Sequence, residues 1–255
     1  MFLMNSLHKL AFLVCLSFVF LASGCDDSEI CSSKTNKLLI FLDQTDKDVF
    51  HSVKDDVGIA ISKISKRMFP CRQCEGGFLR IVRVIDNCQN RPLLENSYQP
   101  LPAGITSADI LPKDYTKFLH GIKNYSSEIA LDSTVSGFKN TCLYEPICKE
   151  LNSLVNKFDD GPGGNTKVII YSDMLEHTED AATDLYKQDT LASADFEARL
   201  KKRFKIELPD LSGVEVHIVT ATNTKTQDKV RYAGTLWKEM FESHGAKVDG
   251  PKPNF

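Results

Sequence analysis

The sequence lacks an excess of positive charge, a second long apolar run, internal repeats and low-complexity segments. It has 31 Lys plus Arg against 34 Asp plus Glu, a formal net charge of −3. This balance gives no electrostatic basis for binding nucleic acid. Beyond the N-terminus, no apolar stretch approaches the roughly 20 residues needed to cross a bilayer. A Gly-x-Ser-x-Gly motif is also absent, and Ser, His and Asp form no recognisable triad pattern, which argues against a serine hydrolase.

Residues 1–24 are expected to be an export signal. Lys9 supplies a positive charge, and the apolar core from Leu10 to Ala22 is too short to span a bilayer, which is the shape of a secretory signal. The stretch LASGC, Leu21 to Cys25, resembles the lipobox of bacterial lipoprotein signal peptides. The resemblance implies that Cys25 carries lipid and becomes the first residue of the mature chain. Ordinary secretion, with cleavage close to the same point, is the alternative.

A lipidated Cys25 predicts a protein of the bacterial cell envelope, anchored to a membrane and facing the periplasm. Asp26 follows the cysteine, and in enteric-type bacteria an Asp at this position resembles an inner-membrane retention signal. Residues 25–37 are polar and predict a short tether, roughly 40 Å when fully extended. The predicted organisation is therefore a signal peptide over 1–24, a tether over 25–37 and one α/β domain over 38–255.

An even number of cysteines beyond the lipobox favours disulfides in an exported chain. The candidates are Cys31, Cys71, Cys74, Cys88, Cys142 and Cys148. The sequence does not decide among the pairings, although we expect a local bond from Cys71 or Cys74 to Cys88. Cys71 and Cys74 form a CxxC that follows a predicted helix, whereas redox-active pairs open one, so a structural role is favoured. No second close pair completes a four-cysteine zinc site.

Apolar strands alternate with amphipathic helices along the chain. Leu38–Leu42 is a continuous apolar run, which is typical of a strand buried on both faces of a parallel sheet. Further strands are predicted at Gly77–Ile85, Lys167–Asp173 and Val214–Thr220. Helices are predicted at Asp48–Met68, Lys113–Ile122, Leu143–Phe158, Phe196–Phe204 and Gln227–Ser243. The alternation predicts a three-layer α/β fold with a mainly parallel central sheet flanked by helices.

Oxygen-bearing side chains follow two of the predicted strands. Asp43 and Thr45 come directly after the first strand, and Ser172 and Asp173 end a later one. Sites in open α/β sheets form beyond the carboxyl ends of the strands, so these groups are expected to converge. Carboxylate and hydroxyl oxygens suit Mg²⁺, Mn²⁺ or Ca²⁺. A divalent cation would also relieve the repulsion between the two aspartates.

Three segments resemble those of a von Willebrand factor type A domain. They are FLDQT followed by a helix, NTCLYEPI opening a later helix, and IIYSDM ending a strand. That family builds its metal-ion-dependent adhesion site from Asp-x-Ser-x-Ser, a Thr opening a later helix and an Asp after the fourth strand. The resemblance implies that Asp43, Thr45, Thr141 and Asp173 hold the cation, and that a partner protein's carboxylate completes its coordination. It also implies a von Willebrand type A-like, Rossmann-like architecture.

Lys47 departs from the family pattern, because it stands where the second Ser is expected. An ammonium group cannot ligate a cation, but it can neutralise Asp43 and Asp173 where the metal would lie. A functional cation site and a degenerate site from which the cation is absent therefore both remain open. A third interpretation is that Asp43 and Thr45 only cap a helix.

Binding of a partner protein in the cell envelope, without enzymatic activity, is the function that these features predict. The alternatives are an envelope hydrolase acting on phosphate esters and a structural lipoprotein with a degenerate metal site. The hydrolase would resemble haloacid dehalogenase-type phosphatases, but Thr45 replaces the second Asp of their Asp-x-Asp-x-Thr motif. The acidic run Met174–Asp180 would either add ligands or partner contacts or, the interpretation we favour, form the first turn of a helix.

Overall fold

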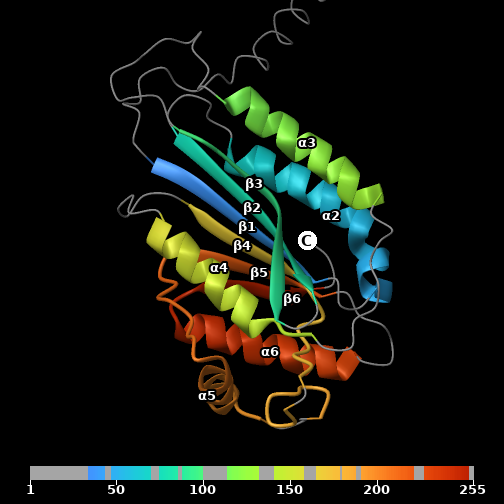
Figure 1. Cartoon of the computed structure of the whole chain (residues 1–255), viewed down its shortest axis with the longest axis vertical. Helices are drawn as coiled ribbons and strands as arrows, with labels where there is room; N and C mark the ends of the chain where they lie inside the picture. The colour runs from blue at the N-terminus through green and yellow to red at the C-terminus, as the bar shows by residue number, and fades with distance from the viewer. Residues whose placement is uncertain are drawn as a thin grey trace, which may run out of the picture.

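The structure, a computed structural model, has helices on both faces of a six-stranded sheet (Figure 1). It describes residues 34–43, 47–69, 75–85, 88–99, 114–131, 141–157, 165–178, 180–187, 191–220 and 227–252. The predicted export signal, Cys25 and Asp26 lie outside these residues, as do Cys31, Cys71 and Cys74. No helix in the described part of the chain is long and apolar enough to span a bilayer.

The sheet has the strand order β3-β2-β1-β4-β5-β6. Its strands are β1 (Lys34–Asp43), β2 (Glu75–Ile85), β3 (Gln89–Tyr98), β4 (Thr166–Tyr171), β5 (Val214–Val219) and β6 (Lys247–Lys252). All neighbours pair in parallel except β2 and β3, which are antiparallel. β1 and β4 are therefore adjacent at the centre of the sheet, with their carboxyl ends at the same edge.

In the described part of the chain, five helices form the two outer layers. They are α2 (Lys47–Met68), α3 (Tyr115–Leu131), α4 (Tyr144–Lys157), α5 (Ser193–Phe204) and α6 (Gln227–Ser243). α2 and α3 cover one face of the sheet, whereas α4 and α6, with α5 outside them, cover the other (Figure 1). The predicted three-layer, mainly parallel α/β fold is thereby confirmed.

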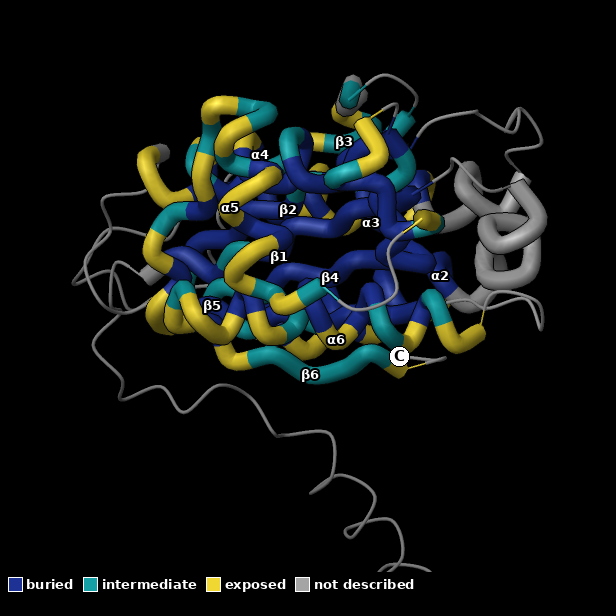
Figure 2. Tube along the Cα trace, turned by 90° about the horizontal axis from the view of Figure 1, so that it is seen from below, coloured by how far each residue is buried: buried dark blue, intermediate teal, exposed yellow. Residues whose placement is uncertain are grey.

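β1 is buried on both faces, as its uninterrupted apolar sequence predicts. Leu39 and Phe41 pack into the core beneath α4, α5 and α6, and Leu38, Ile40 and Leu42 pack into the core beneath α2 and α3. Full burial of each such side chain contributes roughly 1.5–3 kcal/mol. Figure 2 shows that burial decreases toward one edge of the sheet: the central strands are buried, whereas the edge strand β6 is only partly buried.

Two strands and part of a helix escaped prediction. No strand was predicted at β3, where Pro92 interrupts the pattern, or at β6. Pro92 is tolerated because β3 is an edge strand, and because a register shift between Ile81 and Val82 falls opposite it. α3 continues to Leu131, beyond the short helix that was predicted. The first strand begins at Lys34 rather than Leu38. Residues 34–37, which were predicted to belong to the tether, are therefore part of β1.

Cys88 and Cys142 form a disulfide that joins the turn between β2 and β3 to the start of α4. The expected bond from Cys88 to Cys71 or Cys74 is therefore wrong. Cys148, also a disulfide candidate, is a buried free thiol, and burial raises its pKa to about 12. It packs in the core as a small apolar side chain, which the count of cysteines could not reveal.

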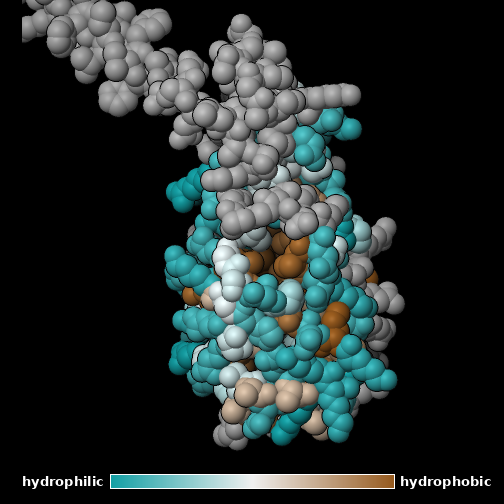
Figure 3. Space-filling view, turned by 90° about the vertical axis from the view of Figure 1, so that its left-hand side faces the viewer, coloured by the Kyte–Doolittle hydropathy of each residue, from teal (hydrophilic) through white to brown (hydrophobic). Residues whose placement is uncertain are grey.

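The outer surface offers little apolar material on the side shown in Figure 3, which is the left-hand side of Figure 1. That face is mostly hydrophilic, with hydrophobic side chains gathered in a small hollow near its middle. This hollow lies away from the carboxyl edge of the central strands. The carboxyl edge is the better candidate for a functional site, because the buried polar residues Asp43, Ser172 and Asp173 lie there.

Removing the Cys88–Cys142 bond should lower the free energy of unfolding by about 2–4 kcal/mol, because the bond links residues 54 positions apart. Cys88→Ser, Cys142→Ser and the double variant should lose similar amounts, since one substitution already breaks the bond. Urea denaturation of the three variants measures these losses. Additive losses in the double variant would show that the two residues do not act as a pair.

Candidate functional site

The adjacency of β1 and β4 places Asp43 beside the end of β4. Leu42 lies opposite Tyr171 in the register of the two strands, and Ser172 Oγ donates a buried hydrogen bond of 2.6 Å to Asp43 Oδ2. Asp173 follows directly. Asp43 and Asp173 are each only 7% exposed. The structure thus brings the two predicted carboxylates to one edge of the sheet.

The chain turns sharply as it leaves β4. Met174 has φ 62°, in the left-handed region that bulky side chains rarely adopt. Its N–H donates to Ser172 Oγ at 2.8 Å, and the N–H of Leu175 donates to Asp173 Oδ1 at 2.9 Å. The hydroxyl of Tyr186 reaches Asp173 Oδ2 at 3.5 Å. Asp173 is therefore held by its own backbone turn and by a neighbouring loop.

Thr141 is joined to the same segment through the backbone. The N–H of His177 donates to the carbonyl of Thr141 at 2.8 Å, and the two residues form an isolated antiparallel bridge. Thr141 is 8% exposed and precedes the disulfide cysteine Cys142. The segment after β4 thus holds Thr141, which lies just before the start of α4.

Glu176 links this segment to α4 with its side chain. Its Oε2 accepts hydrogen bonds from the N–H groups of Leu143 at 2.9 Å and Tyr144 at 3.2 Å. These N–H groups at the start of the helix would otherwise lack intrahelical partners. The favoured interpretation of Met174–Asp180 as the first turn of a helix is wrong, because residues 173–178 are not helical. Glu176 instead points inward and caps a helix distant in sequence.

Burial decides the charge of Glu176. The residue is fully buried, and this burial raises its pKa to about 8, although the bonds from Leu143 and Tyr144 and the charge of Arg203 oppose the shift. The negative charge of Asp43 raises it further. Among the described residues, Glu176 Oε1 finds no hydrogen-bond partner. The pKa of Glu176 therefore lies well above the ordinary range of a glutamate.

A buried aspartate organises the loop that borders the site. Asp184 accepts a hydrogen bond from the N–H of Tyr186 at 2.9 Å, pairs with Lys187 at 2.8 Å and lies 3.2 Å from His177 Nδ1. Burial acts to raise the pKa of Asp184, but the bonds to Lys187 and His177 outweigh it and lower that pKa. The rings of His177 and Tyr186 meet edge to face, 5.0 Å apart, at the partly exposed rim.

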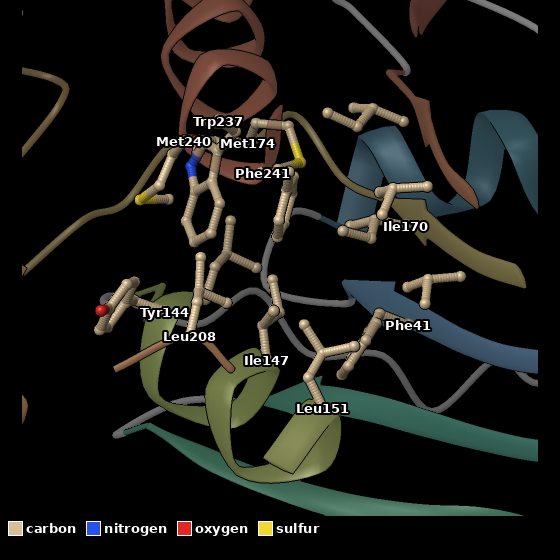
Figure 4. Close-up of a cluster of buried hydrophobic side chains, with 14 of the residues drawn as sticks. Phe41, Tyr144, Ile147, Leu151, Ile170, Met174, Leu208, Trp237, Met240 and Phe241 are labelled. Carbon is tan, nitrogen blue, oxygen red and sulfur yellow. Dashed lines mark hydrogen bonds between the residues drawn. The ribbon is translucent and has the colours of Figure 1, made fainter. Parts of the chain in front are cut away.

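Trp237 is a contributor that sequence reasoning placed only in the core. It lies on α6 in the buried cluster of Figure 4, and its indole Nε1–H donates to the carbonyl of Met174 at 3.1 Å in a buried position. The apolar stripe of α6 predicted its burial correctly but carried no signal of this bond. Two further predicted groups cannot be placed, because Thr45 and the side chain of Lys47 lie outside the described part of the chain.

The raised pKa of Glu176 predicts that the metal-free protein loses stability as pH rises. The folded protein keeps a proton that the unfolded chain releases near pH 4.5, so this stabilisation is complete below that pH and is lost as pH rises through about 8. The slope should approach roughly 1.4 kcal/mol per pH unit. Urea unfolding in chelator at several pH values measures it. Glu176→Gln should show a smaller slope, and equal slopes would contradict the assignment.

Comparison with known proteins gives a likeness of architecture alone. No protein-family model matches the sequence, and the search of curated proteins found no match. Human COPII-coat protein Sec24c is similar with a TM-score of 0.47 and 8% identity, over 88% of this chain and 30% of that chain. The ArnB paralog VWA2 from Sulfolobus acidocaldarius has a TM-score of 0.37 and 14% identity, over 87% of this chain and 42% of its own.

Mussel byssus proximal thread matrix protein 1, whose structure has a zinc-occupied MIDAS motif, has a TM-score of 0.34 and 12% identity, over 84% of this chain and 48% of its own. This chain thus spans less than half the length of these three structures. With scores this low, the fold assignment depends on the chain's own strand order and helical layers. On these features, the chain is a three-layer α/β domain with a mainly parallel central sheet, as the resemblance to von Willebrand factor type A domains implies.

Proposed function

We propose that the chain is a lipid-anchored protein of the bacterial cell envelope that binds a partner protein at the carboxyl edge of its sheet, with a divalent cation at Asp43 and Asp173. The observation that carries the proposal is that Asp43 and Asp173, each 7% exposed, lie at the carboxyl ends of adjacent strands. Two like charges held in a poorly solvated place are unfavourable unless a positive charge or a proton compensates them.

The donors at this edge fit a hard cation. Asp43 and Asp173 offer carboxylate oxygens. Thr141 offers a hydroxyl, and its carbonyl accepts a hydrogen bond from His177 in the segment after β4. Such oxygens suit Mg²⁺, Mn²⁺ or Ca²⁺ rather than a softer metal. Thr45 is a further candidate on sequence grounds alone. A cation bound there would supply the positive charge that draws a carboxylate of the partner.

The surrounding residues give the site its order. Ser172 holds Asp43 through its hydroxyl, and Tyr186 approaches Asp173. His177 and Tyr186 form the partly exposed rim that a partner would meet first. Anchoring depends on Cys25, so the membrane attachment in this proposal is supported by the lipobox-like sequence rather than by the described residues.

Asp43→Asn and Asp173→Asn should each weaken divalent-cation binding by roughly tenfold or more, since each keeps the size of the side chain and removes its charge. Isothermal calorimetry with Mg²⁺, Mn²⁺ and Ca²⁺ measures the change. Asp228→Asn is the matched control, because that acidic side chain is almost fully exposed at the start of α6 and should not matter. Absence of binding by the wild-type protein for all three cations would overturn the cation's role.

Partner binding should depend on the same carboxylates. Affinity capture from the native envelope with the full-length, tagged chain should recover a protein that is lost when a chelator is added. Asp43→Ala should lose the same protein while thermal unfolding shows an intact fold. Recovery that is unchanged in this variant, together with unchanged stability, would place the binding surface elsewhere.

A further inference from the structure

The backbone after Asp173 adopts a conformation that the surrounding structure must hold. Met174 has φ 62°, and its side chain is fully buried. A non-glycine residue in this region is unfavourable and persists only where neighbouring contacts determine it. The hydrogen bonds that hold this turn therefore also determine the position of the Asp173 carboxylate beside it.

Two hydrogen bonds fix Met174 from opposite sides. Its N–H donates to Ser172 Oγ, the hydroxyl that also bonds Asp43. Its carbonyl accepts the bond of 3.1 Å from Trp237 Nε1. The turn is thus connected to β1 through Ser172 and to α6 through Trp237.

The bond from Trp237 acts on the peptide group that also holds Asp173. The carbonyl of Met174 and the N–H of Leu175 belong to one planar unit. Trp237 holds the oxygen of this unit, and the N–H of the same unit donates to Asp173 Oδ1 at 2.9 Å. Rotating the peptide would therefore break both bonds together. The indole N–H consequently orients the donor that fixes the carboxylate of Asp173.

Trp237 is itself held rigidly. It is fully buried on α6, and its ring lies 5.6 Å from that of Phe241, 6.2 Å from Tyr144 and 6.4 Å from Phe196. Figure 4 shows the ring of Trp237 within the buried cluster that also contains Tyr144 and Phe241. A donor fixed by packing on a regular helix can position a neighbouring group accurately.

We infer that Trp237 is a positioning residue for the carboxylate of Asp173. Its N–H fixes the peptide between Met174 and Leu175 and so sets the carboxylate before any cation binds. The effect on cation affinity rests on the proposed function, whereas the positioning exists in the metal-free protein. The two are therefore separable by experiment.

Benzothienylalanine gives a sharp test, because it keeps the shape of tryptophan and replaces its N–H with sulfur. Trp237 is the only tryptophan of the chain, so biosynthetic replacement of tryptophan alters this position alone. We expect cation affinity to fall roughly 10- to 100-fold. Amide hydrogen exchange at Leu175 should become faster in the metal-free protein. Phe241→Leu is the matched control, since it disturbs the same cluster without removing the bond, and should change both quantities clearly less.

The outcomes separate the two ideas. Clearly faster exchange at Leu175 in the benzothienylalanine protein than in Phe241→Leu supports the inference. It does so even if the wild-type protein binds no cation, a result that would defeat only the proposed function. Unchanged exchange at Leu175 overturns the inference. Equal effects of the two changes would also overturn it, because they would show that Trp237 contributes packing and nothing more.

Discussion

The hydrogen bond from Ser172 to Asp43 joins the ends of the two central strands and anchors everything else at the candidate site. It spans 129 positions of sequence and measures 2.6 Å. The bond exists only because β1 and β4 are neighbours in register, which in turn depends on the burial of their apolar side chains between the helical layers. The hydrophobic core thus determines that Asp43 and Asp173 share one edge, although neither contributes to that core.

The segment after β4 is tied to three different elements within five residues. Ser172 bonds Asp43 at the end of β1, Met174 accepts from Trp237 on α6, and Glu176 caps α4. Each tie satisfies a polar group that burial would otherwise penalise. A displacement of α4 or α6 would therefore also move the segment that contains Asp173. The position of the site depends on these helices and strands, not on a loop alone.

Sequence patterns predicted what depends on local periodicity and missed what depends on tertiary contact. The apolar run of β1 and the stripe on α6 were legible because core burial imposes regular spacing. Glu176 was misjudged because an acidic run resembles a first helical turn, and only the fold reveals that α4 needs its oxygen. Cys148 counted as a disulfide candidate because an even number gives no information about burial. Pro92 concealed β3, since only an edge strand accepts it.

Binding of a partner carboxylate at this edge needs a positive charge or a proton that compensates the two aspartates. A partner carboxylate would be repelled by Asp43 and Asp173 unless something neutralised them. Lys47 is the first residue of α2, where the helix dipole disfavours a cation by roughly 0.3–1 kcal/mol. The sequence has Lys47 where the resembled pattern has a hydroxyl ligand. An ammonium group that reached the two aspartates would compete with a metal ion for them, and the measured metal affinity would then be the difference between the two interactions.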